Sequence, residues 1–270
     1  FQDLESGINY FRYMWIHASA VPGDAPQEVK DIVYPIGPGQ GIIVASDEYR
    51  KQYTEDDTRK NASFLEIYSK DQETGENKFY VSVVLKGKGL VRDGDRIFAD
   101  DIILYRYADF LLLMADVYNE LDETDRAANL VNEVLRRART SVSPEASQPV
   151  DFPSGLSKDQ MRKKIFYERL FELAAEPEMY FDIRRGGTET LKMALEIVNR
   201  HDITYEHCEG EAQHNNPDQR FRDRYFGEDA TFYGKVSDES FLKKNLHLPI
   251  PHSELSANDG LSAADQNFGY

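Results

Sequence analysis

The sequence "IILYRYADFLLLMADVYNEL", residues 102–121, has the periodicity of an amphipathic helix. Its apolar residues recur three and four positions apart, which places one set on a single helix face: Leu104, Ala108, Leu111, Leu112, Ala115 and Tyr118. Residues 126–139 repeat this pattern with Ala128, Val131, Leu135 and Ala138. Only residues 122–125 separate the two segments, a length that favours an antiparallel hairpin of tetratricopeptide type. No second copy follows at a period of about 34 residues, so one hairpin does not indicate a repeat array.

Further helices and a few strands are expected on either side of this hairpin. Ser157 and Gln160 form a capping-box pattern that predicts a helix to Glu176, which Pro177 ends or kinks. Another helix is expected after Gly186 and Gly187. Upstream, the pattern predicts a strand at 28–36, a flexible loop at 37–41, a short helix within 47–60, and a hairpin of strands at 62–70 and 78–86. The expected fold is mainly α, with long irregular loops and a few short strands that give it a minor α+β character. We expect a single domain spanning 1–270.

Composition argues against several classes of function. The 270 residues include 32 Lys and Arg against 48 Asp and Glu, a formal charge of −16. Such a surface repels phosphate backbones and anionic lipid headgroups, so nucleic-acid binding is not expected. The chain has one cysteine, so no disulfide framework is expected, and no apolar run approaches the ~18 residues of a membrane span. We expect no cofactor and no metal, because 37–41 lacks the spacing of a phosphate-binding loop and one His/Cys group matches no common zinc pattern: His201, His207, Cys208 and His214.

The stretch "FYERLFELAAEPEMYFDIRRGG", residues 166–187, is dense in charged residues. Glu168, Glu172 and Glu176 are four residues apart and would share one helix face. Paired carboxylates about 5 Å or about 6.5–9.5 Å apart perform glycoside hydrolysis, so a hydrolase is one interpretation. However, such pairs flank their substrate from opposite sides, and three arginines lie close enough in sequence to pair with the acids and lower their pKa: Arg169, Arg184 and Arg185. We therefore expect a structural ion-pair network at a helix junction.

Three stretches resemble, in order, the signatures of one family. They are "YRYADFLLLMADVYNEL" with "AANLVNEVLRRA", then "YERLFELAAEPEMYFDIRR", and finally "LPIPHSEL" followed by "QNFGY"; "YTEDDTRKNASF" resembles a further upstream element. The ordered set is similar to the SusD/RagB family of outer-membrane nutrient-binding lipoproteins, from about residue 28 to the end of the sequence. The resemblance implies that the signature charges are structural and not ligand contacts: Arg106, Asp109, Glu168, Arg169, Glu172, Glu176, Asp182 and Arg185. Pro177 and Met179 depart from the family pattern, so a re-shaped helix end is expected there.

The resemblance also implies a function and a location. Such proteins are non-catalytic receptors that bind oligosaccharides, or in some members peptides, and deliver them to a SusC-like TonB-dependent transporter. They are exposed on the cell surface and held at the outer membrane by a lipid anchor. The anchor and the N-terminal helical-repeat half would be absent from this chain, which resembles the C-terminal portion. Two alternatives remain: a helical scaffold for protein partners, and a glycoside hydrolase built on Glu168, Glu172 or Glu176.

Candidate ligand contacts are the aromatic residues of the N-terminal region. Sugars present flat C–H faces that pack on aromatic rings, so a binding cleft needs exposed aromatics on loops. Trp15, Tyr13 and Tyr34 are the first candidates, although Trp15 could instead belong to the core. A second, weaker set occupies a polar segment: Tyr225, Phe226, Phe232 and Tyr233.

Overall fold

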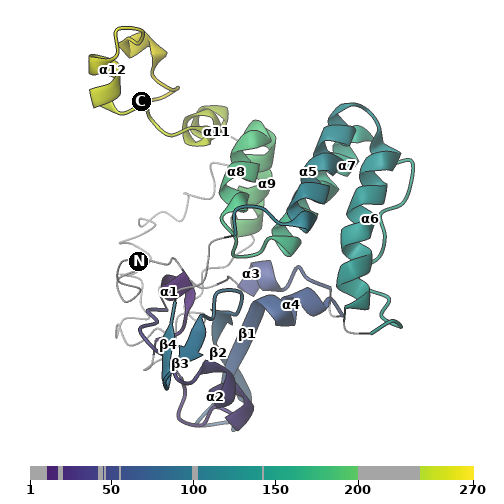
Figure 1. Cartoon of the computed structure of the whole chain (residues 1–270), viewed down its shortest axis with the longest axis vertical. Helices are drawn as coiled ribbons and strands as arrows, with labels where there is room; N and C mark the ends of the chain where they lie inside the picture. Colours follow the sequence, from purple (N-terminus) through teal and green to yellow (C-terminus); the bar gives the residue numbers. More distant parts are fainter. Residues whose placement is uncertain are drawn as a thin grey trace. The chain divides into compact units, whose positions relative to one another are not determined.

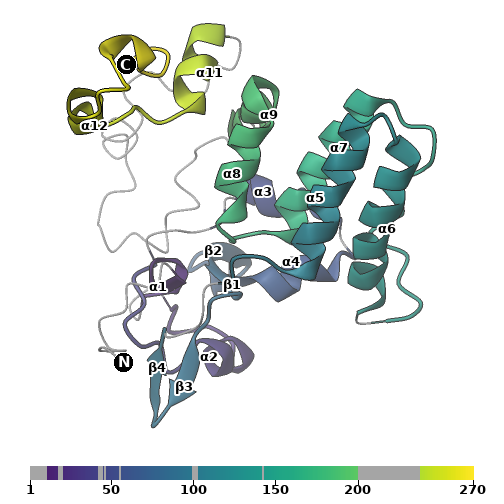
Figure 2. The same cartoon turned by 45° about the horizontal axis from the view of Figure 1, so that its top comes forward.

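The computed structural model describes residues 11–17, 21–41, 45, 47–54, 56–98, 103–141, 143–199 and 238–270. The described chain is mostly helical and contains two small antiparallel sheets of two strands each (Figures 1 and 2). It divides into two compact units, of which the first ends at Ala175 and the second begins at Glu176. A single domain over 1–270 stays a prediction. Among the described helices, none combines the length and the apolar character needed to cross a bilayer.

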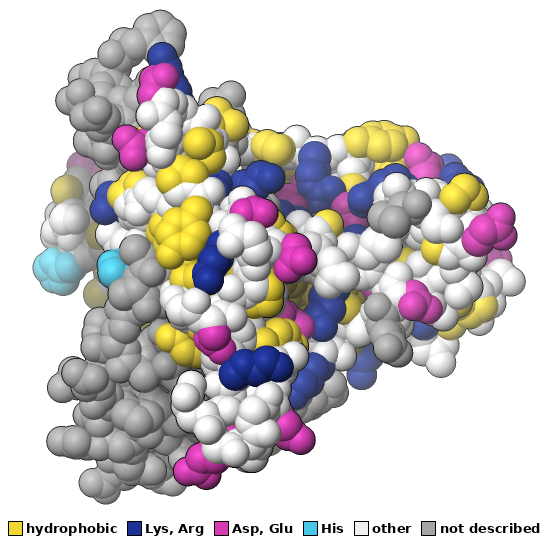
Figure 3. Space-filling model, turned by 90° about the horizontal axis from the view of Figure 1, so that it is seen from below, with side chains coloured by type: hydrophobic (Ala, Val, Ile, Leu, Met, Phe, Trp, Pro, Cys, Tyr) yellow, Lys and Arg dark blue, Asp and Glu magenta, His cyan; other side chains and the backbone are white. Residues whose placement is uncertain are grey.

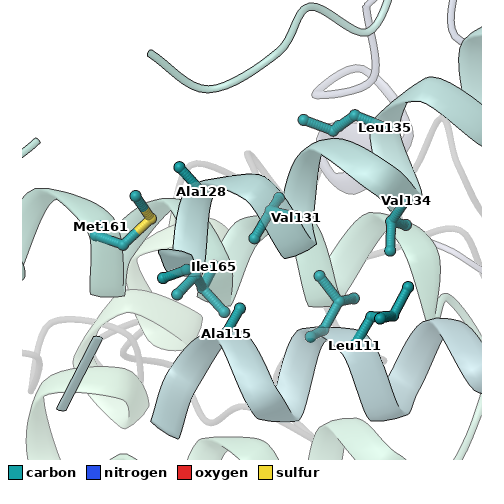
Figure 4. Packing of buried hydrophobic residues seen from close by; sticks show 10 residues of the cluster. Leu111, Ala115, Ala128, Val131, Val134, Leu135, Met161 and Ile165 are labelled. Carbon is teal, nitrogen blue, oxygen red and sulfur yellow. The ribbon is translucent and has the colours of Figure 1, made fainter. Parts of the chain in front are cut away.

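The helical part of the first unit is the expected hairpin with a third helix packed on it. Helix α5 is Tyr107–Glu120, α6 is Thr124–Thr140 and α7 is Lys158–Glu172. Their shared core contains the predicted inner-face residues of both hairpin helices except Leu104 and Ala138, and Met161 and Ile165 of α7 complete it. Figure 4 shows Leu111 and Ala115 pointing toward Val131, with Ile165 beside Ala115. The hairpin is therefore confirmed, but α5 begins five residues later than predicted, because Arg106 is extended, and Leu104 lies exposed outside the helix.

Helix α7 begins as the sequence predicts and ends earlier. Ser157 accepts a hydrogen bond from the amide of Gln160, and the Gln160 side chain accepts one from the amide of Ser157. The helix ends at Glu172 rather than Glu176, and Ala175 adopts a left-handed φ of 62° that no helix continues through. Pro177 is the N-cap residue of α8, Glu178–Arg185, so this proline does separate two helices as predicted, but the first of them has already ended four residues before Glu176. The remaining described helices are α9, Gly187–Asn199, α11, Glu239–Leu246, α12, His252–Ala257, and the 3-10 turn η5, Ala263–Asp265.

The N-terminal part of the first unit contains both sheets. Strands β1, Phe64–Lys70, and β2, Asn77–Val84, pair antiparallel as predicted. Strands β3, Leu90–Arg92, and β4, Asp95–Ile97, form a second hairpin that was not predicted, although its turn is an Asp-Gly pair, a strong hairpin signal. The short helices are α1, Phe11–Met14, α2, Gln27–Val33, α3, Asp47–Arg50, and α4, Thr58–Ser63.

The strand predicted at 28–36 is wrong, because most of it is helix α2. Val29 and Val33 are four residues apart, and both pack on one core, so the helical spacing outweighs the local alternation. Pro26 precedes the helix and Pro35 follows it, which leaves only seven residues for α2. The buried residues of this core come from α2 and the segment after it, from β1 and β2, from the segment after α1 and from the residue after β4: Trp15, Ile16, Val33, Ile36, Ile67, Val81, Val83 and Phe98.

The glycine loop at 37–41 is packed, in contrast to the flexible loop that the sequence suggested. The amide of Gln40 donates to the carbonyl of Arg12 at 3.0 Å, and that of Gly41 to the carbonyl of Trp15 at 2.7 Å. Gly37 has a φ of +65°, and a Cβ there would lie 2.5 Å from the carbonyl oxygen of Arg96. The loop therefore joins α1 to the second hairpin and needs glycine to approach it.

Candidate functional site

A buried charge network centres on Glu172, the last residue of α7. Its carboxylate forms ion pairs with Arg106 at 2.6 Å, with Arg59 at 3.3 Å and with Arg137, and its side chain is almost fully buried. These arginines come from the segment before α5, from α4 and from α6. The Glu172 carbonyl accepts further hydrogen bonds from Arg106 at 2.5 Å and from Lys86 at 2.8 Å. A carbonyl that would lack a partner at a helix end is thereby satisfied.

Arg59 extends the network to two more acids. It forms an ion pair with Glu168, one turn before Glu172, and a forked pair with Asp57 at 2.9 and 2.7 Å. Asp57 also caps α4 by accepting from the Arg59 amide at 3.0 Å. On another side of α7, Arg169 donates to Asp109 of α5 at 2.6 Å, and both side chains are buried. The network therefore ties α4, α5, α6 and α7 together at one place.

The two glutamates of the network titrate differently. Burial raises the pKa of Glu168 to about 7, against the lowering effect of Arg59. Burial also acts to raise the pKa of Glu172, but the charges of Arg137, Arg106 and Arg59 outweigh it, so the pKa of Glu172 is lowered. The lowered carboxylate pKa that the neighbouring arginines predicted is therefore wrong for Glu168.

The expected ion-pair network is present at the helix junction, but its partners differ from those predicted. Arg169 pairs with Asp109, Arg184 lies 3.6 Å from the ring centroid of Tyr180, and Arg185 pairs with Asp182 at 3.0 Å. Glu168 and Glu172 instead pair with arginines that are distant in sequence, because α7 packs against three other helices. The predicted shared face of three glutamates is also wrong, since Glu176 lies beyond the end of α7.

This geometry gives little support to the hydrolase interpretation. Glu168 and Glu172 are each only 4% exposed, and guanidinium groups occupy their oxygens. Hydrolytic carboxylates must reach a glycosidic oxygen and an anomeric carbon from opposite sides. Neither glutamate presents an oxygen to a substrate in this arrangement.

Of the three candidate ligand contacts, Trp15 lies in the core. Its side chain is 0% exposed, the Arg96 guanidinium lies 4.4 Å from its ring centroid, and Phe98 packs at 6.4 Å. Trp15 is therefore a core residue, and no sugar can pack on the face of its ring in this structure. Tyr13, in α1, is half-buried, whereas Tyr34, directly after α2, is 49% exposed.

Arg96 links the buried Trp15 to the exposed Tyr34. Its guanidinium donates to the carbonyls of Ile32 at 3.0 Å and Pro35 at 2.8 Å, on both sides of Tyr34, and to that of Lys88 at 2.5 Å. The backbone that carries Tyr34 is thereby fixed against β4, with Ile32 also exposed beside it. Figure 3 shows a molecular face on which hydrophobic side chains lie between basic and acidic ones.

Sequence reasoning did not identify Arg96, although the Asp-Gly turn beside it would have placed it in a hairpin. The second aromatic set and the His/Cys group lie outside the described residues. Within the residues that the structure does describe, no three His, Cys, Asp or Glu side chains gather in a way that could hold a metal ion.

The α5–α6 hairpin with α7 against it defines a mainly helical protein with tetratricopeptide-like packing. The family model described as the SusD family matches residues 34–270. The chain belongs to the SusD family, as the resemblance of its motifs indicated.

Named relatives and solved structures agree with this assignment. SusD-like protein P25 of Formosa agariphila is 28% identical over 237 residues, which cover 86% of this chain and 36% of that protein. SusD-like protein P2 of the same organism is 28% identical over 182 residues, 62% of this chain and 34% of that protein. NanU of B. fragilis superposes with a TM-score of 0.58 at 23% identity, covering 97% of this chain and 47% of that one. A SusD superfamily protein from Bacteroides vulgatus gives 0.57 at 21% identity, covering 97% and 49%.

In all four matches, this chain covers only part of the other protein's length. The chain spans about a third of the two curated relatives and less than half of the two solved structures. At such identities, the likeness to the structures shows the fold.

Proposed function

We propose that this chain is part of a non-catalytic receptor that binds oligosaccharides at the cell surface and delivers them to a SusC-like TonB-dependent transporter. The family match over residues 34–270 carries the proposal. The charge network supports it, because the glutamates that could have been catalytic are buried and paired with arginines. Attachment to the outer membrane would use a lipid anchor outside these residues. A peptide is the alternative ligand.

Tyr34 is the proposed ligand contact, with Tyr13 as a second candidate. An exposed tyrosine offers a ring face for the C–H face of a sugar and a hydroxyl for its polar edge. Arg96 holds the backbone on both sides of Tyr34, so the ring sits on a fixed support and loses little freedom on binding. In this proposal Trp15 is not a contact and supports the site through its stack with Arg96.

Binding of a glycan library and a peptide library, followed by calorimetry, tests the proposal. We expect Tyr34→Ala to weaken glycan binding by about 10-fold, on the scale of one lost aromatic contact. Tyr68→Ala is the matched control, since Tyr68 is a similarly exposed tyrosine on β1, and it should leave affinity unchanged. Equal loss in both variants would remove Tyr34 from the site.

The same incubations test the absence of catalysis. We expect no release of reducing ends from any glycan that binds. Release that Glu172→Gln abolishes, with binding retained, would establish a hydrolase and overturn the receptor proposal.

A further inference from the structure

The buried side chain of Arg96 holds two separate backbone segments together. Its guanidinium donates to the carbonyls of Ile32 and Pro35, on both sides of Tyr34. A third hydrogen bond from the same group reaches the carbonyl of Lys88, which lies just before β3. In both views α2 lies beside the β3–β4 hairpin (Figures 1 and 2). Because one guanidinium reaches all three carbonyls, the backbones of Tyr34 and Lys88 are neighbours in space although they are distant in sequence.

Three exposed apolar or aromatic side chains and one cation gather around this guanidinium. Ile32, Tyr34 and Val91 are all exposed. Val91 lies opposite Arg96 in the hairpin, and opposite residues of an antiparallel pair share a face, so Val91 is on the face toward α2. Lys88 is exposed too, and among the described residues no group pairs with its side chain. We call the set of Ile32, Tyr34, Val91 and Lys88 the Tyr34 surface.

Among the described residues, the acids near the Tyr34 surface leave Lys88 without a counter-ion. Asp31 of α2 accepts a hydrogen bond from Gln27 at 2.7 Å, and the exposed Glu28 does not pair with Lys88. Asp95 comes one position before the arginine in β4. Successive side chains of a strand point to opposite faces, so that of Asp95 is on the face away from α2. The ammonium of Lys88 is therefore available to a ligand.

We propose that the oligosaccharide bound at Tyr34 carries an anionic group, a carboxylate or a sulfate, that pairs with the ammonium of Lys88. This ligand class rests on the proposed function, because it concerns the same site. A tyrosine ring accepts the C–H face of a sugar and does not distinguish neutral sugars from acidic ones. An unpaired ammonium beside the ring does distinguish them, because a hydrogen bond between charged groups is stronger than one between neutral groups.

The net charge of the chain limits how acidic this ligand can be. With an excess of 16 negative charges, the surface as a whole repels a polymer that carries a charge on every sugar. One local cation offsets this repulsion for one anionic group, since attraction is strongest at contact and salt screens more distant charges. We therefore expect a glycan whose acidic sugars are isolated among neutral ones.

Calorimetry with matched pairs of oligosaccharides tests this ligand class on the 270-residue chain. One pair is an oligosaccharide with a single glucuronic acid and its carboxyl-reduced, neutral form. The other pair is a monosulfated galactose oligosaccharide and its desulfated form. We expect the anionic member of at least one pair to bind about 5-fold more tightly than the neutral member, on the scale of one exposed ion pair. The pair that shows the preference identifies the group as carboxylate or sulfate.

Substitutions of Lys88 assign the preference to its charge. Lys88→Gln removes the charge and should make the two members of the pair bind equally, whereas Lys88→Arg keeps the charge and should retain the preference. Lys163→Gln, at an exposed position of α7, is the matched control and should also retain it. Because Arg96 binds the backbone carbonyl of Lys88, these changes leave the support of Tyr34 in place.

Other results would overturn this ligand class, and they differ from a failure of the proposed function. Equal binding of all four oligosaccharides, lost in Tyr34→Ala and unchanged in Lys88→Gln, would retain the site at Tyr34 and exclude the anionic group. A preference for the anionic member that survives Lys88→Gln would place the anion at another residue. If none of the four binds, and no glycan of the library binds either, the proposed function fails and the ligand class fails with it.

Discussion

At the scale of single residues, Glu172 explains how this fold keeps charges in its interior. Three arginines reach its carboxylate, and two cationic side chains donate to its carbonyl. A buried ion pair adds little net stability compared with a well-packed apolar group, because both charges must leave water. Removing one partner is different, because the remaining buried charges then have no compensation. The network thus fixes which helices meet, and its members depend on each other.

Glu172→Ala should therefore be strongly destabilising. We expect a loss of about 3–5 kcal/mol in the free energy of unfolding, the range for breaking a buried ion pair. Urea unfolding followed by the fluorescence of Trp15, the single tryptophan, measures this loss. Glu123→Ala is the control, because Glu123 pairs with Arg126 on an exposed helix surface, and its effect should be far smaller. Similar losses in both variants would show that the buried network does not act as a unit.

Gly37 is a second residue whose identity the structure requires. Gly37→Ala combines the strain of a left-handed backbone with a Cβ 2.5 Å from the Arg96 carbonyl oxygen. Gly75→Ala is a matched control, because Gly75 has a φ of +73° and no heavy atom within 4 Å of the added Cβ.

The expected cost is about 1–2 kcal/mol for Gly75→Ala, from backbone strain alone, and clearly more for Gly37→Ala. Urea unfolding compares the two variants. Equal costs would mean that the loop moves away from β4 without penalty.

At the scale of elements, α7 shows why some boundaries follow from sequence and others do not. Its start is encoded locally, because Ser157 and Gln160 form both hydrogen bonds of a capping box. The end of α7 is not encoded locally, because it depends on the left-handed backbone of Ala175 and on the arginines that surround Glu172.

The substitution Ser157→Ala tests whether the capping box sets the start of α7. We expect a loss of about 1 kcal/mol, the usual cost of removing a serine N-cap. Ser154→Ala, in the exposed loop just before the helix, should have no measurable effect. The free energy of unfolding checks both, and a loss below about 0.3 kcal/mol for Ser157→Ala would show that packing alone sets the start of α7.

The contrast between local signals and contacts distant in sequence explains how much of the fold and of the site could be predicted. The α5–α6 hairpin was predictable because helical periodicity and a four-residue connection are local signals. The partners of Glu168 and Glu172 were not, because Arg59 is more than 100 residues away from both glutamates in sequence. Trp15 was a candidate ligand contact on residue type alone, with the core as the alternative, and only the packing of Arg96 and Phe98 shows that it is buried. Tyr34 owes its position to Arg96, a contact between segments that no local pattern contains.

At the scale of the whole molecule, the acidic balance of the chain contrasts with its buried cations. Arg50, Arg59, Arg96 and Arg169 are all buried, although the chain has an excess of 16 negative charges. Three of them meet carboxylates, and Arg96 is held by backbone carbonyls. Among the described residues, five buried carboxylates accompany these cations, those of Asp57, Asp109, Glu168, Glu172 and Asp182, so the acidic excess of the chain remains at the surface. Such a surface keeps the protein soluble and disfavours polyanionic ligands.

Glu168 should give the global stability a pH dependence opposite in sign to that of an ordinary paired carboxylate. Its pKa in the folded protein is about 7, above the ordinary value of 4.5, so the folded state binds this proton more tightly than the unfolded state does. Its contribution is therefore fully present below pH 4.5 and is lost as the pH rises through 7. Glu172, whose pKa is lowered, contributes stability above its ordinary value, and that contribution disappears only as the pH falls through the lower, folded-state value.

Between pH 5 and 7, Glu168→Gln isolates the first effect, because glutamine does not titrate. We expect the stability of the wild type relative to Glu168→Gln to decrease as the pH rises from 5 to 7, by at most a few kcal/mol, since one pKa unit corresponds to about 1.4 kcal/mol. Urea unfolding of both proteins across this range, followed by Trp15 fluorescence, measures the difference, and titrating groups outside the network cancel in it. A constant difference would show that Glu168 keeps its charge throughout, and that Arg59 offsets the effect of burial completely.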